Sequence, residues 1–462
     1  MRKQLELWAG LEGSLTRVGD SLYDQFAETG HLTRAGDFDR IADLGATTVR
    51  YALHWERIAP DGDLFRADWR FTDAQMTRFQ ERGVAVAATL LHHGSGAIGY
   101  TSLLDPHFPA KFAAFARAAA ERYPFVTLWT PINEPLTTAR FAGLYGFWHP
   151  HGRSEQSFAR ILVNQIKAIV AAMREIRAVI PPAQLLQTED LGKTYATARM
   201  GHQAYFENTR RFLTWDLLCG MVNDDAHRMW GHLLWAGIGA SELREFADAP
   251  CPPDIIGVDH YLTSERFLDE RRERYPTHTW GANESDTYAD IEAVRVLGDG
   301  LRGGLASLLS EVWRRYALPV AIAEVHLGTE DEAEQARWLA DVWQTARHIR
   351  QTGADIRAVT AWAAFGAYDW NSLMTRRDRV YERGLWDIER TNADGSPRAT
   401  LCAEVARALA QTGELPPLPA LDIPGWWQTD RRLIYPVVEA DELAPDCFNG
   451  NAERESRPLF VK

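Results

Sequence analysis

Eight short runs of apolar and β-branched residues alternate with longer, helix-like stretches along most of this 462-residue chain. Several runs are apolar at almost every position, which is typical of parallel strands covered on both faces. No Gly-x-Gly-x-x-Gly motif follows an early run, so the alternation favours an α/β fold of the (β/α)8 TIM-barrel type over an open doubly wound sheet. The runs are Leu5–Leu11, Thr47–Leu53, Val84–Leu91, Val126–Ile132, Gln184–Glu189, Asp254–Tyr261, Pro319–Val325 and Ala358–Ala364.

Amphipathic periodicity between the runs predicts the helices of the barrel. The segment 190–253 is too long for a single crossover helix, and we interpret it as a helical elaboration of a loop. We therefore expect elaborated βα loops on the barrel. The clearest helical stretches are Phe108–Tyr123, Phe158–Ile180, Ala289–Tyr316 and Asp331–Gln351.

The sequence pattern changes near Gln411, which divides the chain into a predicted catalytic barrel over 1–410 and a C-terminal tail over 411–462. The tail contains Glu-Leu-Pro-Pro-Leu-Pro-Ala and Ile-Pro-Gly-Trp-Trp, which are proline-rich and lack clear periodicity. Two interpretations stay open: an extended tail that wraps the barrel, or a linker to another domain.

Composition excludes several classes of partner. The net charge of −13 disfavours nucleic acid, which needs a basic surface. Four cysteines without a CxxC pair disfavour both a disulfide framework and a zinc site, so we expect reduced thiols, no metal and no cofactor. The N-terminal residues lack the apolar stretch of a signal peptide, and no segment is suited to span a membrane. These features predict a cytoplasmic enzyme, and they give no indication of its oligomeric state.

Two glutamates end strands of the predicted barrel, where the catalytic groups of such barrels lie. Glu134 follows the fourth run in Trp-Thr-Pro-Ile-Asn-Glu-Pro, and Glu324 ends the seventh in Leu-Pro-Val-Ala-Ile-Ala-Glu-Val-His. Cleavage of a glycosidic bond needs one acid to protonate the leaving oxygen and one carboxylate at the anomeric carbon. The alternative is that each glutamate only forms a salt bridge in a loop. Asn-Glu-Pro favours catalysis, because it puts an amide that can bind a substrate hydroxyl beside the acid. We therefore expect a carbohydrate substrate, and retention requires the two carboxyl carbons to lie about 5 Å apart.

The motif Thr-Pro-Ile-Asn-Glu-Pro resembles the acid/base motif of glycoside hydrolase family 1, the β-glucosidase-like retaining enzymes with (β/α)8 barrels. The likeness extends from about residue 5 to about residue 400, and five motifs occur in the family's order. It implies that Glu134 is the acid/base and Glu324 the nucleophile. A related family of the same clan is the alternative.

The resemblance also implies roles for further residues. Arg50, in Thr-Val-Arg-Tyr, would lie beneath the nucleophile, and Tyr261, in Gly-Val-Asp-His-Tyr, would donate a hydrogen bond to it. His92 and Asn133 would bind hydroxyls of the glycon, and Trp362 would form a platform for the sugar.

Some positions depart from the family pattern. Glu12 stands near the usual glutamine of the first strand, and Asp369 with Trp370 replaces the usual Glu-Trp that grips the far end of the glycon. The nucleophile motif reads Ala-Glu-Val-His in place of Thr-Glu-Asn-Gly, and His93 stands where an aromatic residue is common. Catalysis tolerates these changes, whereas glucose specificity does not follow from them.

Four arginines follow the eighth run. They suit a carboxylate or phosphate on the sugar, because a guanidinium binds two oxygens at once. The alternative is that they pair with Asp378, Glu382 and surface acids. The arginines are Arg376, Arg377, Arg379 and Arg383.

These residues are compatible with three functions. The first is a retaining β-glycosidase. The second is a non-catalytic sugar-binding relative within a larger polypeptide, which would have no need to keep both glutamates and Arg50. The third is a metal-dependent barrel hydrolase that uses histidine pairs such as His149 and His151, which we interpret instead as loop histidines.

Overall fold

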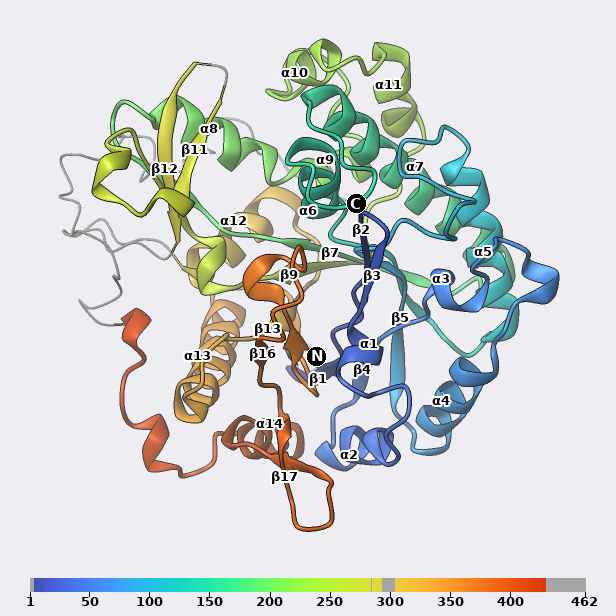
Figure 1. Ribbon diagram of the computed structural model, residues 1–462, viewed down its shortest axis with the longest axis vertical. Helices are drawn as coiled ribbons and strands as arrows, with labels where there is room; N and C mark the ends of the chain where they lie inside the picture. The colour runs from blue at the N-terminus through green and yellow to red at the C-terminus, as the bar shows by residue number, and fades with distance from the viewer. Residues whose placement is uncertain (1–3, 284, 293–303, 429–462) are drawn as a thin grey trace.

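A computed structural model describes residues 4–283, 285–292 and 304–428. Its centre is a closed barrel of eight parallel strands in the order β1-β14-β13-β9-β7-β6-β5-β4, with helices around it (Figure 1). The predicted (β/α)8 barrel is therefore confirmed. The strands are β1 (Glu6–Gly10), β4 (Thr48–Ala52), β5 (Ala85–His92), β6 (Leu128–Asn133), β7 (Gln184–Asp190), β9 (Ile255–Asp259), β13 (Val320–Val325) and β14 (Ile356–Ala361).

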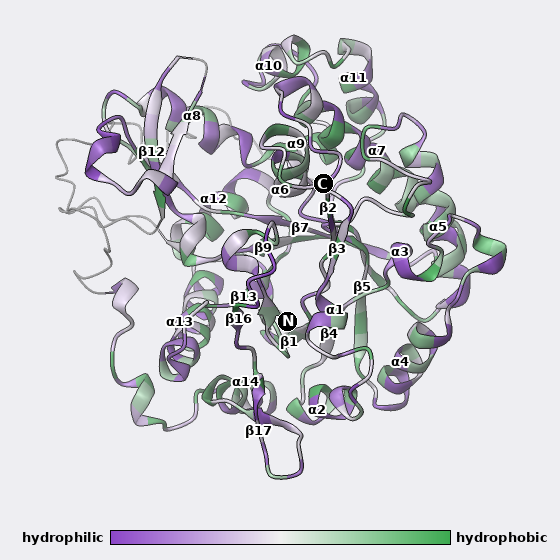
Figure 2. Ribbon diagram, viewed as in Figure 1, coloured by the Kyte–Doolittle hydropathy of each residue, from purple (hydrophilic) through white to green (hydrophobic). Residues whose placement is uncertain are grey.

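All eight predicted strands are present, and most ends agree within two residues. The eighth begins two residues earlier than predicted and ends at Ala361, so Trp362 follows the strand directly. The strands are buried almost throughout because helices cover their outer faces, and Figure 2 shows hydrophobic residues along β5. A small inner cluster that includes Trp8, Leu186 and Ile255 fills part of the barrel itself.

The helices between strands return the chain to the same end of the barrel, as parallel strands require. Three of the four helical stretches expected from periodicity are confirmed, as α5, α7 and α13. The longer barrel helices are α2 (Asp37–Leu44), α4 (Arg70–Glu81), α5 (Phe108–Arg122), α7 (Glu155–Val179), α12 (Leu305–Tyr316), α13 (Glu332–Gln351) and α14 (Leu401–Thr412).

The expected helix over 289–316 is wrong in its first part. Residues Thr287–Glu292 form strand β12, and the helix α12 begins only at Leu305; residues 293–303 lie outside the described part of the chain. β12 pairs antiparallel with β10 (Arg266–Asp269) and β11 (Trp280–Ala282). Pairing with these two strands outweighs the local periodicity that suggested a helix.

The loops after β7 and β9 carry most of the elaboration. The predicted helical segment between β7 and β9 is confirmed, although it opens with a short strand, β8 (Thr194–Ala196). β8 joins β10, β12 and β11 in a second sheet with its own apolar core, seen beside the barrel in Figure 1. The helices of this segment are α8 (Gly201–Arg210), α9 (Leu213–Leu218), α10 (Trp230–Trp235) and α11 (Ala240–Asp248).

Smaller elements lie in the loops between the barrel strands and helices and in the C-terminal tail. The strands among them form three two-stranded sheets, β2-β3, β15-β16 and β17-β18. The remaining elements are β2 (Leu15–Val18), β3 (Ser21–Asp24), α1 (Gln25–Glu28), α3 (Trp55–Ile58), α6 (Pro135–Ala139), η2 (Arg140–Leu144), β15 (Ala367–Tyr368), β16 (Tyr381–Glu382), β17 (Trp386–Thr391), β18 (Pro397–Ala399) and the short 3-10 turns η1 (Leu64–Arg66), η3 (Leu262–Ser264), η4 (Arg272–Arg274), η5 (Thr277–Thr279), η6 (Trp370–Ser372), η7 (Pro419–Leu421) and η8 (Trp426–Gln428).

The described beginning of the C-terminal tail packs against α13. Trp427 is buried, lies edge-on against Trp338 with the ring centroids 5.3 Å apart, and donates its indole N–H to Asp341. Residues 429–462 lie outside the described part of the chain, and the boundary near 410 stays a prediction. Among the described residues, no helix is long and apolar enough to cross a membrane.

Candidate active site

Arg50 joins three strands at the carboxyl end of the barrel. It projects from β4 and is 1% exposed. One terminal nitrogen, Nη1, lies 2.9 Å from Glu324 Oε1 on β13, and Nη2 donates to Asn133 Oδ1 on β6 at 2.7 Å. The carbonyl of Ala323 accepts a further bond from Nη1. The strand register thus places a permanent cation beside Glu324, where the sequence predicted it.

Tyr261 binds the other oxygen of Glu324. It follows β9, and its phenolic O–H donates to Glu324 Oε2. Glu324 therefore receives hydrogen bonds on both carboxylate oxygens while it is 3% exposed. Burial raises the pKa of Glu324, and Arg50 and Tyr261 oppose this shift because both favour the carboxylate.

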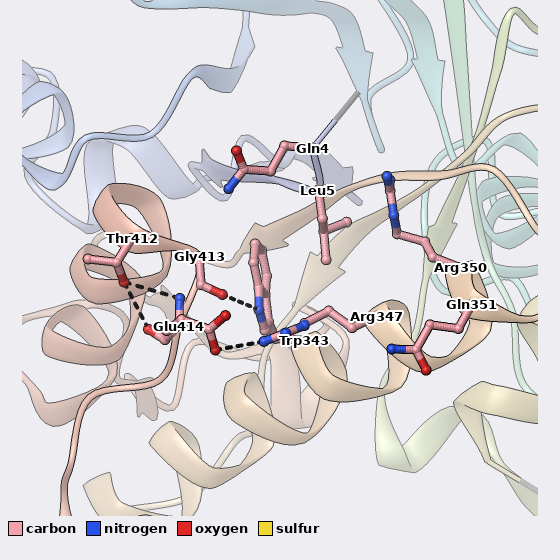
Figure 3. A pocket seen from close by; sticks show the side chains of 9 residues that line it. All are labelled: Gln4, Leu5, Trp343, Arg347, Arg350, Gln351, Thr412, Gly413 and Glu414. Carbon is pink, nitrogen blue, oxygen red and sulfur yellow. Dashed lines mark hydrogen bonds and ion pairs between the residues drawn. The ribbon is translucent and has the colours of Figure 1, made fainter. Parts of the chain in front are cut away.

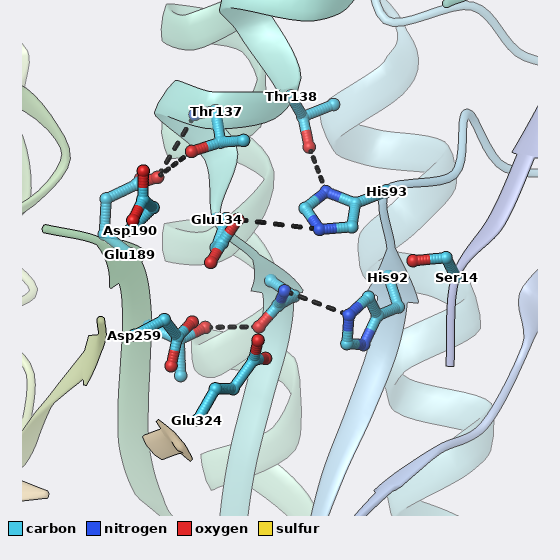
Figure 4. Close-up of polar contacts among 12 residues, drawn as sticks. Ser14, His92, His93, Glu134, Thr137, Thr138, Glu189, Asp190, Asp259 and Glu324 are labelled. Carbon is cyan, nitrogen blue, oxygen red and sulfur yellow. Dashed lines mark hydrogen bonds and ion pairs between the residues drawn. The ribbon is translucent and has the colours of Figure 1, made fainter. Parts of the chain in front are cut away.

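Glu134 lies opposite Glu324 in a different environment (Figure 4). It follows β6 directly, precedes Pro135 and has a positive φ of 44°, a conformation that costs a non-glycine residue about 1–3 kcal/mol. Its carboxyl Oε2 lies 3.5 Å from His93 Nε2. Burial and then the charges of Asp259 and Glu324 raise the pKa of Glu134 well above its usual value.

His93 thus lies in the site, which the amino-acid sequence alone did not establish. Its Nδ1 lies 3.0 Å from the Thr138 hydroxyl, which can donate to it and leave the Nε2 proton facing Glu134. Burial lowers the pKa of His93 to about 3, so the ring is neutral at ordinary pH.

Glu12, His92 and Trp362 form a second polar group at the mouth. His92 and Asn133 are register partners on β5 and β6, and Asn133 Nδ2 lies 3.1 Å from His92 Nε2. The Trp362 indole N–H donates to Glu12 Oε2 at 3.3 Å, and its ring lies under the Arg50 guanidinium at 4.8 Å. Burial and the charge of Glu324 raise the pKa of Glu12 to about 7.

A glycine makes room for the tryptophan of this group. A Cβ atom at Gly10 would lie 2.3 Å from the Trp362 ring, far inside van der Waals contact. Any larger residue at the end of β1 would therefore displace the indole.

Asp369 and Trp370 lie in the loop after β14. Asp369 has a φ of 61°, and its Oδ1 accepts the backbone N–H of Val380 at 2.9 Å, so it also holds its own loop together. The Trp370 ring lies edge-on to His93, with centroids 5.5 Å apart. The other eight residues expected in the site thus lie with Glu134 and Glu324 at the carboxyl end of the barrel.

Sequence reasoning missed two buried carboxyls of this region. Asp259 ends β9, and Glu189 lies next to the last residue of β7; both are 0% exposed. Glu189 accepts the backbone N–H groups of Leu136 and Thr137 at the start of α6, directly after Glu134. An acid at the carboxyl end of a barrel strand is the signal that selected Glu134 and Glu324, and it would have found these two as well.

The arginines after β14 are engaged elsewhere. Arg376 pairs with Asp378, Arg379 with Glu28 and Arg383 with Asp387, and Arg377 donates to the Leu22 carbonyl. Of the two interpretations of these arginines, the structure favours pairing with the protein's own acids.

In the histidine pair of the loop after β6, His151 contacts backbone groups. His151 Nε2 accepts the backbone N–H of Gly19, and His151 Nδ1 contacts the Gly146 carbonyl. Within the described ranges, the group of side chains suited to hold a metal ion consists of Glu134, Asp259 and Glu324, and includes no histidine.

A hollow at the other end of the barrel has no comparable chemistry. It lies beside the start of β1, between the ends of α13 and α14, and Figure 3 shows Arg347 paired with Glu414 and Trp343 bonded to Gly413. In barrels of this kind the amino-terminal face supports stability, whereas reactions take place at the carboxyl-terminal face.

A (β/α)8 barrel with two buried, differently bonded glutamates at its carboxyl end defines the class of the barrel glycoside hydrolases. The sequence model of Glycosyl hydrolase family 1 matches residues 28–393, which is most of the chain. The chain belongs to this family.

Curated relatives are distant but cover most of the chain. It is 21% identical over 437 residues to Beta-glucosidase 47 of Arabidopsis thaliana, covering 84% of this chain and 78% of that protein. A shorter match, 24% over 251 residues, is to Probable inactive beta-glucosidase 14 of Oryza sativa subsp. japonica, with 49% of this chain and 48% of that protein covered. Among solved structures, the family 1 b-glucosidase from Thermotoga maritima has a TM-score of 0.70 at 15% identity, covering 90% of this chain and all of that one.

Proposed function

We propose that this protein is a retaining β-glycosidase, with Glu324 as nucleophile and Glu134 as acid/base. The observation that carries the proposal is the unequal environment of the two glutamates. Glu324 is held by Arg50 and Tyr261, which favour its ionised form, whereas Glu134 is buried beside other acids, which favour its protonated form. Two carboxyls with environments that divide their charges in this way can serve as base and acid.

The reaction would proceed in two displacements. Glu134 protonates the glycosidic oxygen as the bond to the anomeric carbon breaks, while Glu324 attacks that carbon and forms a glycosyl ester. Glu134 then removes a proton from water, which hydrolyses the ester and frees Glu324. Carboxyl oxygens of the two residues lie within 4.8 Å of each other, which supports the short separation that retention requires.

The glycon would lie over the second polar group of the mouth. Glu12, His92 and Asn133 offer acceptors and donors to its hydroxyls, and Trp362 offers an aromatic face. Asp369 and Trp370 would contact its far end. Because the arginines of this loop are engaged with the protein's own acids and carbonyls, we do not assign an acidic glycon. A panel of nitrophenyl glycosides would identify the sugar.

The non-catalytic alternative has less support. A binding protein needs neither an acid nor a nucleophile, yet this chain keeps both, together with Arg50 and Tyr261 on the nucleophile. We propose a cytoplasmic location, as the sequence predicted.

Substitution of the two glutamates tests the proposal. We expect Glu324→Gln to lower turnover of every glycoside by at least about 10⁴-fold, because no ester can form. Glu134→Gln should lower turnover of alkyl glycosides by about 10²–10⁴-fold but spare dinitrophenyl glycosides, whose leaving group needs no proton. Steady-state rates and mass spectrometry of the ester trapped by a 2-deoxy-2-fluoro glycoside measure both effects.

Glu56→Gln is the matched control, since Glu56 is a buried glutamate outside the site that accepts the backbone N–H of Gly96. Near-normal rates in both site variants would refute the assignment, and a trapped ester on any residue other than Glu324 would refute the choice of nucleophile.

A further inference from the structure

Asp259 is a third carboxyl at the reacting centre. It is the last residue of β9, where the register places it opposite Asp190 on β7 and Glu324 on β13. Its side chain is completely buried, and one of its oxygens lies within 4.8 Å of oxygens of both Glu134 and Glu324. Figure 4 shows it beside the two glutamates.

The oxygens of Asp259 accept no hydrogen bond from an N–H or hydroxyl group among the described residues. Arg50 Nη1 lies 3.7 Å from Oδ1, too far for a hydrogen bond, and donates to Glu324 and Ala323 instead. A buried, ionised carboxylate without donors is costly, and three buried carboxylates beside one arginine cannot all be ionised cheaply. A proton held between two of them removes both difficulties.

We propose that Asp259 shares one proton with Glu134 in the resting enzyme and so positions that proton for the leaving group. Glu134 is the partner because Glu324 already receives hydrogen bonds on both oxygens and stays ionised. This inference rests on the proposed function of Glu134 as acid/base. Asp259 would be a positioning residue, since it acts through Glu134.

The shared proton keeps the charge of the centre constant. At rest Glu324 carries one negative charge and the Glu134–Asp259 pair carries another. When Glu134 gives its proton to the glycosidic oxygen, the pair gains a negative charge as Glu324 loses one by forming the ester. Hydrolysis of the ester returns the proton from water to the pair and the charge to Glu324. The three carboxyls therefore hold two negative charges throughout, against the single cation of Arg50.

Other charged and titratable groups also face Glu134. His93 approaches from the end of β5, Glu324 from β13 and Tyr261 from the loop after β9, and β7 contributes Glu189 and Asp190. Arg50 on β4 donates to Glu324. Glu189 is bonded to the start of α6, and Asp190 accepts the Ser264 hydroxyl. After burial, Asp259 is the strongest influence raising the pKa of Glu134.

The pH profile of Asp259→Asn tests the proposal. Loss of the neighbouring carboxyl lowers the pKa of Glu134, so the acid loses its proton at lower pH. We expect the alkaline limb of kcat/KM for an alkyl glycoside to move down by about one to two pH units. The same limb should move little for a dinitrophenyl glycoside, which needs no proton from Glu134. Asp259→Ser, which is also neutral, should give the same shift and serves if the asparagine variant fails to fold.

Glu56→Gln, which also removes a buried carboxyl, should leave the alkaline limb where it is. If Asp259 serves only to balance Arg50, its loss will move the acidic limb, which reports Glu324, and leave the alkaline limb unchanged. That outcome would overturn the proposal. Trapping by a 2-deoxy-2-fluoro glycoside separates the two proposals: wild type that forms no ester contradicts the function, whereas ester formation with an unmoved alkaline limb in both Asp259 variants contradicts only the shared proton.

Discussion

At the scale of single residues, the two glutamates differ through their neighbours and share the same chemistry. Arg50 and Tyr261 donate to Glu324, whereas Glu134 faces His93 and two further carboxyls. Both glutamates are nearly inaccessible to solvent, so each neighbouring charge acts through a medium that screens it weakly. The placement of a few donors therefore decides which carboxyl keeps its proton.

Tyr261→Phe would test the role of the phenolic O–H on Glu324. Loss of a hydrogen bond that favours the carboxylate raises the pKa of Glu324, so the acidic limb of kcat/KM should move to higher pH. A charge-assisted bond of this kind contributes about 1.5–3 kcal/mol, which corresponds to a roughly 10- to 100-fold fall in kcat. The pH dependence of steady-state rates measures both effects.

Tyr51→Phe provides the control, because Tyr51 is a buried tyrosine of β4 whose O–H contacts His31 away from the site. An unmoved acidic limb in Tyr261→Phe, or an equal change in Tyr51→Phe, would show that Tyr261 does not act on Glu324.

At the scale of elements, the loops at the mouth contain strained residues. His93, Glu134 and Asp369 each follow a strand and each have a positive φ. Such a conformation persists only where the surroundings fix it. For Glu134, Glu189 provides that support, because it holds the first N–H groups of α6 as well as the hydroxyls of Thr137 and Thr214.

Glu189→Gln should therefore disturb Glu134 through α6. The glutamine amide has one acceptor oxygen, whereas the carboxylate has two. The N–H and hydroxyl groups that face the new NH₂ group therefore lose their acceptor. We expect a loss of about 1–3 kcal/mol in the free energy of unfolding. We also expect a fall of about 10-fold or more in kcat with little change in KM, because the acid moves out of place. Denaturant titration and steady-state kinetics measure the two effects.

Asp331→Ala separates stability from positioning. Asp331 caps α13, which follows β13, and its loss should cost about 1 kcal/mol without a change in kcat. If Asp331→Ala lowers kcat as much as Glu189→Gln does for the same loss in the free energy of unfolding, Glu189 has no positioning role.

At the scale of the whole molecule, several buried carboxyls set how stability depends on pH. Burial raises the pKa values of Glu12, Glu56 and Glu189 to about 7. Between the unfolded value near 4.5 and about 7, the folded chain binds more protons than the unfolded chain, so stability falls as pH rises. Asp216, whose pKa Arg315 and His227 lower to about 2 against the effect of burial, contributes stability that is lost as pH falls below about 4.

Thermal unfolding should therefore show the highest Tm near pH 4–5 and a decline up to about pH 7. Each raised carboxyl contributes on the order of 1–3 kcal/mol to that decline. Glu56→Gln should reduce the decline without affecting catalysis, because Glu56 lies outside the site. A Tm that rises between pH 5 and pH 7 would contradict this account.

The sequence predicted the barrel and its catalytic end because both depend on local patterns. Apolar runs identify strands, parallel strands bring their carboxyl ends together, and Glu134 and Glu324 each end such a run. Arg50 and Tyr261 followed from family motifs of adjacent residues. The helix expected over 289–316 failed because β12 is stabilised by strands that come earlier in the chain, which periodicity cannot reveal.

By itself, then, the sequence determined the fold, the family and which two glutamates face the barrel mouth. Tertiary structure decided the neighbours of those glutamates. The register of β9 against β13 brings Asp259 beside Glu324, and the fold of the loop after β14 turns Arg379 to Glu28 and Arg383 to Asp387. Strand formation depends on residues adjacent in the chain, whereas charge and hydrogen bonding act between groups that only folding brings within a few ångströms.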